Sequence, residues 1–315
     1  MSDASSVFRN TFATTVNDFV NQINASSELH QFMLIFMIFL GVLVYVQEVG
    51  RFMILGFEPE KIINSTLMIF FTLFVWGSYS EIIDSLIEVA DGIGLIFLKL
   101  GTGNSDPFFL HKWINHSLKF MLGSELSFWD MTIGDVLYAI LWHVAGFVLE
   151  LCMYFIGSWA MWTLALAKIL SILFVPMLMH PATRNMFDAW VKFTLGSIML
   201  LIVVRAAGVL TALGIQAQFK AIGIVQCGHL ADFASCNWIT KNTHGGTSFI
   251  NYADTLVTII IGILLILSSI GLSATLVSDV ASPSAAATRG AGMAAKKIMK
   301  MPDVASIINR FNKGR

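Results

Sequence analysis

Two ionisable residues, Glu150 and Arg205, stand deep inside long apolar stretches of the sequence. Lys168 joins them if its own apolar stretch crosses a membrane twice. A charged side chain at the centre of a bilayer costs about 2.5–3.5 kcal/mol on insertion scales, so these residues should face protein or water. Two interpretations stay open: a polar seam that lines a passage or a subunit contact, or one buried Glu150–Arg205 pair that orients two helices. Helical rise offsets the two residues by up to about two turns, so direct contact requires tilted helices or a neighbouring subunit.

A second pair of reactive side chains, Cys227 and Cys236, shares a polar, glycine-containing loop. The orientation derived below places this loop in an oxidising compartment, where we expect a disulfide that stabilises the chain by roughly 2–3 kcal/mol. A zinc site made of Cys227, His229, Cys236 and His244 matches no standard ligand spacing. We therefore predict no metal.

Known catalytic patterns are missing from the sequence. It contains no Walker A sequence, no His-Glu-x-x-His motif and no nucleophile elbow. We therefore predict a protein that is not an enzyme, has no catalytic residues and needs no cofactor.

The composition places most of the chain in lipid. Hydrophobic residues make up 56% and charged residues 12% of the 315 residues, whereas a soluble domain has about 25% charged residues. The mean hydropathy is +0.75, and charges are absent from several long windows. We expect an all-α, polytopic integral membrane protein with amphipathic interfacial helices.

Apolar windows and turns divide the chain into consecutive segments. These are an amphipathic helix in 1–28, a transmembrane hairpin in 29–80, an amphipathic region in 81–135, a transmembrane core in 136–213 with a turn at 180–192, a polar loop in 214–253, a last transmembrane helix in 254–279 and a basic tail in 280–315. In 81–93 an apolar stripe runs beside an acidic stripe made of Glu81, Asp84, Glu88 and Asp91. Two stripes at a period of 3.6 predict an interfacial or partner-facing helix.

Positive charge at the end of the chain sets the orientation. The stretch 289–315 holds seven basic residues and a single acid, Asp303. The positive-inside rule places this tail in the cytoplasm, the loop 214–253 outside and the turn 180–192 inside. The outside is the periplasm if the cell is a bacterium.

The number of spans depends on residues 136–179, an almost continuous apolar run. If this run is one span with an inner extension, the protein has five spans and a periplasmic N-terminus. If it is two spans, there are six and the N-terminus lies inside. We favour five, because the acidic, lysine-poor region 81–135 is then external, although acidic residues influence topology only weakly.

Two prolines predict the cytoplasmic turn. Pro176 loosens the helix because it lacks an amide donor, and Pro181 disfavours helical geometry at His180. After the turn we expect a short helix that lies flat in the inner interface, with Phe187 on its apolar side and Trp190 at the headgroup level.

The stretch "ALAKILSILFVPMLMHPATRNMFDAWVKFTLGSIMLLIVV" resembles the signature region of the TrbL/VirB-type polytopic inner-membrane proteins of type IV secretion systems. The resemblance covers roughly 40 residues. The matching positions are Pro176, Pro181, Thr183, Arg184, Phe187 and Trp190.

This resemblance implies a homo-oligomeric inner-membrane platform or channel component that supports pilus assembly and past which DNA or protein substrates move. The partners that it implies are pilins, a small inner-membrane subunit and the ATPases of the system, besides the lipid membrane and transient contact with the translocated DNA or protein. The alternative is a small-solute or ion transporter that uses Glu150 and Arg205 at mid-membrane. Such a transporter should contain inverted repeats, and the "PMLMHPATR" break has no second copy.

Overall fold

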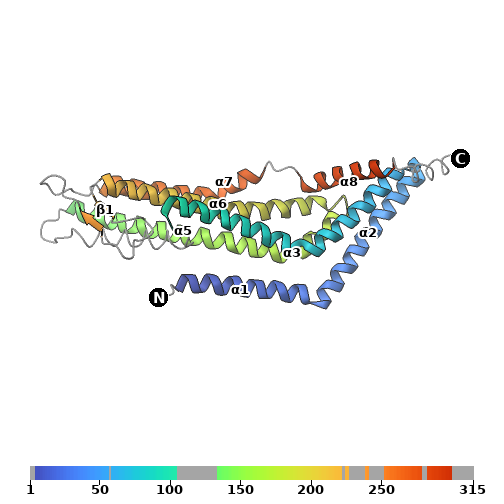
Figure 1. Ribbon diagram of the computed structural model, residues 1–315, viewed down its shortest axis with the longest axis horizontal. Coiled ribbons are helices and arrows are strands. Elements are labelled where there is room, and N and C mark those ends of the chain that lie inside the picture. Colours follow the sequence, from blue (N-terminus) through green and yellow to red (C-terminus); the bar gives the residue numbers. More distant parts are fainter. Residues whose placement is uncertain are drawn as a thin grey trace. The chain divides into compact units, whose positions relative to one another are not determined.

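The computed structural model describes residues 4–56, 58–104, 133–221, 224–226, 238–240, 252–278 and 282–299. Its elements (Figure 1) are the helices α1 (Ala4–Ala25), α2 (Ser27–Leu55), α3 (Pro59–Thr102), α5 (Ile133–Phe174), α6 (Arg184–Ala221), α7 (Tyr252–Ser278) and α8 (Pro283–Met299), the 3₁₀ turn η1 (Pro176–Leu178), and the short strands β1 (Ile224–Gln226) and β2 (Trp238–Thr240), which pair antiparallel. The expected helical fold is thus confirmed, apart from this small ladder.

Among the described residues, four stretches are long and apolar enough to cross a membrane: Ser27–Ile54, Ile140–Phe174, Arg184–Gln218 and Ala253–Ala294, the last of which holds α7 and the first turns of α8. These stretches indicate a multi-pass membrane protein. The predicted count of five or six exceeds these four, and the second half of the hairpin expected in 29–80 lies in α3. Residues 140–174 form one uninterrupted helix, as the prediction of one span with an inner extension requires.

Capping residues define the ends of α2. The Ser26 hydroxyl accepts a hydrogen bond from the Leu29 amide at 3.4 Å, which satisfies one unpaired donor of the first turn. At the other end Gly56 adopts a φ of 91°, where a glycine has no Cβ penalty, and its amide donates to the Phe52 carbonyl. The chain can therefore reverse into α3 within a few residues.

The chain divides into two compact units: 1–85, 164–195 and 278–315 form the first, and 86–163 with 196–277 form the second. In the first unit, Met37 and Leu40 of α2 pack with Met179, which follows η1. All three side chains are at least 95% buried. The connection between α5 and α6 is therefore part of a core and not a loose loop.

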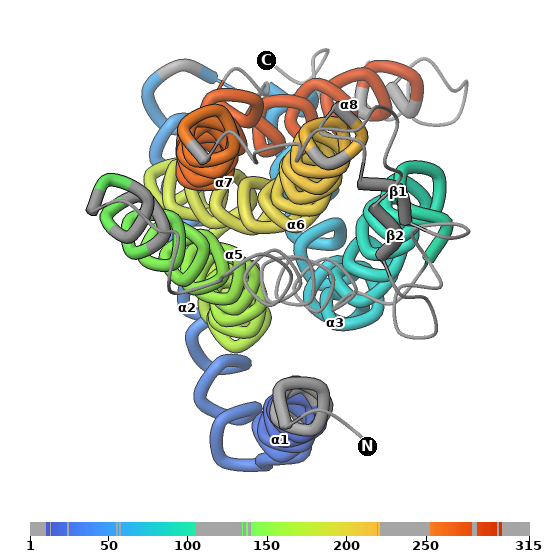
Figure 2. Tube along the Cα trace, turned by 90° about the vertical axis from the view of Figure 1, so that its left-hand side faces the viewer, coloured from blue at the N-terminus to red at the C-terminus, as the bar shows by residue number. Residues whose placement is uncertain are grey.

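The second unit is organised around α6 (Figure 2), whose apolar window is 56% buried compared with 22–28% in the other three candidate spans. Glycines let its neighbours approach closely. A Cβ added to Gly94 of α3 would lie 2.6 Å from Cδ of Arg205, and one added to Gly262 of α7 would lie 2.5 Å from Cγ2 of Thr211. Gly262 thus packs against α6 of its own chain.

Candidate functional site

The turn between α5 and α6 is closed by two residues of the sequence motif. Thr183 Oγ1 donates to the Met177 carbonyl at 2.7 Å, and Arg184 Nε donates to the Leu178 carbonyl at 3.1 Å. The prolines end α5 and leave these carbonyls without helical amide partners. The expected break at Pro176 and Pro181 is confirmed, and the side chains after it supply the missing donors.

The motif's aromatic residues tie the two helices together behind the turn. Trp190 Nε1 donates to the Ala167 carbonyl at 3.0 Å, and the Phe187 and Trp190 rings pack with centroids 5.7 Å apart. Both side chains are buried. Protein therefore covers the indole and accepts its N–H, and the headgroup level expected for Trp190 stays a prediction.

The expected flat interfacial helix is not a separate element. Residues 184–192 are the first turns of α6, which continues without a break to Ala221. Neither proline nor glycine occurs between Arg184 and Leu195, so nothing interrupts the hydrogen-bond ladder where the sequence analysis placed a boundary.

A buried carboxylate on α6 caps the N-terminus of α8. Asp188 Oδ1 accepts the Ser284 amide at 2.8 Å, and Oδ2 accepts the hydroxyls of Ser284, at 2.7 Å, and of Ser282. The Ser282 hydroxyl in turn accepts the Ala285 amide at 3.2 Å. A carboxylate here satisfies unpaired amides and lies at the positive end of the helix dipole.

Two cations of α6 fasten the same segment. Lys192 Nζ donates to the Ser278 carbonyl at the end of α7, at 3.0 Å, and Arg184 Nη1 donates to the Thr288 hydroxyl in α8, at 3.2 Å. The guanidinium of Arg184 therefore reaches both the turn and α8. We call Arg184, Asp188 and Lys192 with their partners on the α7–α8 segment the C-terminal dock.

Sequence reasoning missed this dock and the start of α8. The signal was present as Ser282-Pro283, an N-cap residue followed by proline at the first helical position. The residue that caps this helix could not be predicted from the sequence, because Asp188 lies 96 residues before Ser284.

Two buried cations pair with the acidic stripe of α3. Within the first unit, Lys168 Nζ lies 2.7 Å from Asp84 Oδ1 and 3.3 Å from Asn17 Oδ1 of α1. The Lys168 side chain is 8% exposed and that of Asp84 54% exposed. The lysine is thus the buried member of the pair.

In the second unit, the guanidinium of Arg205 bonds both the carboxylate and the main chain of Asp91. Nη2 donates to Oδ1, and Nη1 donates to the carbonyl at 2.7 Å. Gly94 leaves the room for this guanidinium, since a Cβ there would lie 2.8 Å from Nη1. Arg205 is one of the expected intramembrane charges, whereas Asp91 belongs to the region 81–135, which is expected to be external. The seven-residue spacing of Asp84 and Asp91 is the signal in the sequence that these two carboxylates share a helix face.

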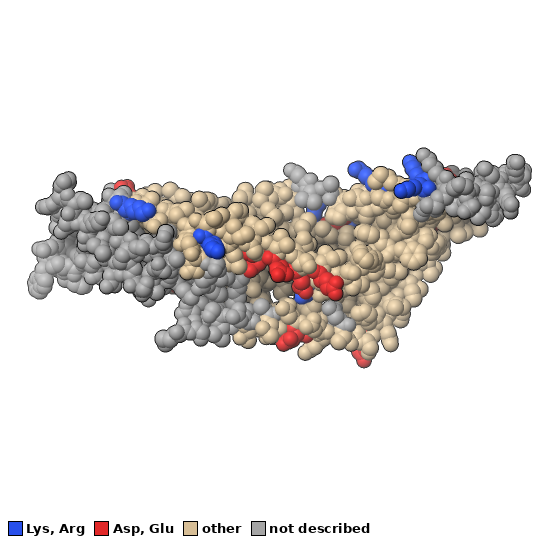
Figure 3. Space-filling model, viewed as in Figure 1, with Lys and Arg blue, Asp and Glu red and all other residues tan. Residues whose placement is uncertain are grey.

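The later part of α3 presents three faces along one helix. Figure 3 shows acidic side chains gathered over it. Its buried face has Ile83 and Ala90, its exposed apolar face has Ile82, Leu86 and Val89, and its acidic face has Glu81, Asp84, Glu88 and Asp91. Glu81 and Glu88 are exposed, so the acidic face continues beyond the two ion pairs.

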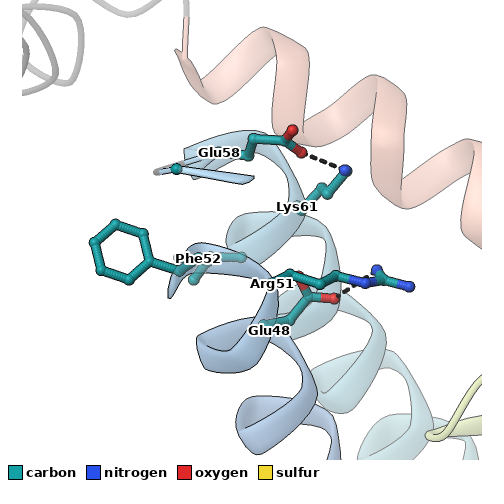
Figure 4. Close-up of a pocket in the computed structure, with 7 residues that line it drawn as sticks. Glu48, Arg51, Phe52, Glu58 and Lys61 are labelled. Carbon is teal, nitrogen blue, oxygen red and sulfur yellow. Dashed lines mark hydrogen bonds and ion pairs between the residues drawn. The ribbon is translucent and has the colours of Figure 1, made fainter. Parts of the chain in front are cut away.

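A small hollow at the α2–α3 corner is lined by Glu48, Arg51, Phe52, Gly56, Glu58, Lys61 and Ile62 (Figure 4). Arg51 Nη1 donates to Glu48 Oε1 at 3.3 Å, between residues three positions apart on α2. Lys61 pairs with Glu58. Each charge is matched by an opposite charge nearby, so this hollow has the character of a salt-bridged corner.

The remaining predicted site residues are only partly placed. Glu150 is half-buried in α5, and Cys227 and Cys236 lie outside the described residues. Within the described parts of the chain, no group of three or more His, Cys, Asp or Glu side chains could hold a metal ion.

Comparison with known proteins identifies the family of the chain. Residues 33–234 match the family described as TrbL/VirB6 plasmid conjugal transfer protein, a stretch that includes the motif turn and the acidic face of α3. No curated protein matches the chain. The family match extends over more than half of the chain, from α2 through α6, and the chain belongs to the TrbL/VirB6 family of plasmid conjugal transfer proteins.

Proposed function

We propose that the chain is an inner-membrane platform or channel component of a type IV secretion (conjugation) system, which supports pilus assembly and the transfer of DNA or protein. Family membership supports the conjugation role, and the four apolar helices support the multi-pass location. Such a component acts with other subunits: pilins, a small inner-membrane subunit, ATPases and further copies of itself.

The observation that carries the proposal is the depth of the acidic face. Arg205 lies near the middle of the apolar span Arg184–Gln218, and Asp91 is bonded to it. Glu88 precedes Asp91 by one helical turn, about 4.5 Å along the axis, and is exposed. An exposed carboxylate therefore lies at membrane depth.

Contact between the Glu88 carboxylate and lipid is unfavourable in free energy. A charged side chain in the bilayer centre costs about 2.5–3.5 kcal/mol, and among the described residues neither Glu81 nor Glu88 has a counterpart like Lys168 or Arg205. Water or another subunit is the favourable neighbour. A hydrated path or a subunit contact along α3 is what a transfer component requires.

The contacts of the first unit support five spans with both the tail and the α2–α3 corner in the cytoplasm. Lys296 of α8 lies 3.8 Å from Glu60 at the start of α3. The basic tail is expected inside, so the corner beside it is inside too, α2 runs inward and the N-terminus is periplasmic. Six spans would place the same corner outside.

A thiol-accessibility experiment tests the acidic face. In a chain whose native cysteines have been replaced, we expect Glu88→Cys to react with a membrane-impermeant maleimide in intact donor cells or inverted vesicles. Val89→Cys is the matched control, because this neighbour is 60% exposed on the apolar face of the same helix. Equal protection of both positions would show that the acidic face is not hydrated.

A transfer assay tests the conjugation role separately. A donor that lacks the chain should transfer no DNA, and the intact chain supplied in trans should restore transfer. Unchanged transfer without the chain would overturn the proposed role, whatever the thiol experiment shows.

A further inference from the structure

The outward face of α8 combines three cations with one apolar side chain. Met293 is 69% exposed. Arg289, Lys296 and Lys297 stand four residues before it and three and four residues after it, so all three surround it on one helical face. Each is exposed, and α8 contains no acidic residue, but Lys296 also lies 3.8 Å from the Glu60 carboxylate of α3.

The opposite face of α8 is occupied by its own chain. Ser284 is buried, and Ala287, Thr288 and Ala291 are partly buried. These small residues lie on the side that is bonded to Asp188 and Arg184. The dock therefore fixes which side of α8 faces outward.

The dock also fixes where that face begins. Lys192 bonds the last residue of α7, and Asp188 bonds the first turn of α8. The α6 residues that make these bonds belong to the first turns of an apolar span, next to the motif turn. The cations of α8 consequently start at a membrane boundary and not at the end of a free tail.

We infer that this face of α8 binds the anionic surface of the bilayer, with Met293 inserted among the headgroups and Arg289 and Lys297 contacting lipid phosphates. A basic segment directly beside a span is attracted by anionic lipid, and long cationic side chains place their stems along apolar surface while their charged ends stay in water. A nucleic-acid surface would need the cations but gives no role to an exposed methionine at their centre. The inference goes beyond the proposed function, since it concerns lipid and not the transferred substrate.

Fluorescence in nanodiscs tests the inference. The full chain, with native cysteines replaced, carries an environment-sensitive dye at Gly290→Cys, where a Cβ meets nothing within 4 Å. We expect blue-shifted emission in discs that contain phosphatidylglycerol, little shift in pure phosphatidylcholine, and loss of the difference at high salt.

Two variants test the proposed lipid contacts, and a third is the control. Arg289→Gln with Lys297→Gln, and Met293→Gln, should each remove most of the shift, whereas Lys220→Gln, at an exposed lysine near the end of α6, should leave it unchanged. Unchanged thermal unfolding in detergent shows that the variants fold. Equal emission in the two lipids overturns the inference, and so does lysine-dependent binding of a duplex oligonucleotide in phosphatidylcholine discs without any response to phosphatidylglycerol.

Discussion

The Asp188 carboxylate accepts the backbone amide of Ser284 at 2.8 Å, so a residue in the second turn of α6 caps a helix that begins some ninety residues later. Three donors, the Ser284 amide and the hydroxyls of Ser282 and Ser284, converge on this one side chain. The motif turn and the C-terminal segment are therefore one structural element in the folded protein.

Replacing the capping carboxylate should release α8. We expect Asp188→Ala to destabilise the dock by about 1–2 kcal/mol, because the first amides of α8 lose their acceptor. Trypsin cleavage at Arg289 in detergent should become faster. Asp188→Asn, which keeps one acceptor oxygen, should show an intermediate rate, and an unchanged cleavage rate in Asp188→Ala would contradict the capping role.

Replacing Asp84 should destabilise the protein more than replacing its partner Lys168. Asp84→Asn leaves a buried ammonium without its counterion, whereas Lys168→Met leaves only a half-exposed carboxylate. We therefore expect Asp84→Asn to cost about 1–3 kcal/mol and Lys168→Met less. Thermal unfolding in detergent measures both, and the double variant should recover most of the loss caused by Asp84→Asn. A larger loss from Lys168→Met would be inconsistent with this geometry.

Gly94 and Gly92 form a matched pair on α3. Gly94→Ala puts a Cβ against the Arg205 guanidinium, whereas nothing lies within 4 Å of a Cβ at Gly92. We expect Gly94→Ala to lower the melting temperature and to reduce conjugal transfer. Gly92→Ala should stabilise the helix by up to about 1 kcal/mol, because alanine is the better helix former. Equal behaviour of the two variants would exclude close α3–α6 packing at Arg205.

The contribution of the Trp190 N–H hydrogen bond to stability can be measured separately from that of the ring. Trp190→Phe keeps most of the apolar volume but loses the bond to the Ala167 carbonyl, and we expect a loss of about 1 kcal/mol. Trp159→Phe is the control, since this tryptophan is 49% exposed. Thermal unfolding of both variants is measured in one detergent. Equal melting temperatures would show that the Trp190–Ala167 hydrogen bond does not stabilise the turn.

Local chemistry made parts of this fold predictable from the sequence. Proline geometry ends α5 at the expected place, and apolar windows locate the long helices. The prediction of a separate interfacial helix is wrong, because residues 184–192 contain no helix-breaking residue and continue into the rest of α6. The partners of Asp188, Lys168 and Arg205 could not be predicted, since each bond joins residues distant in the chain and depends on tertiary packing.

The bonds of the C-terminal dock determine when it can form during synthesis of the chain. A ribosome that has just completed α6 has already synthesised Arg184, Asp188 and Lys192, whereas Ser278, Ser284 and Thr288 are still to come. The C-terminal dock can therefore be completed only after α8 has been synthesised. A chain truncated before Ser282 would keep α7 and the Lys192–Ser278 bond, but Asp188 would lose all the donors supplied by Ser282 and Ser284, and Arg184 would lose Thr288.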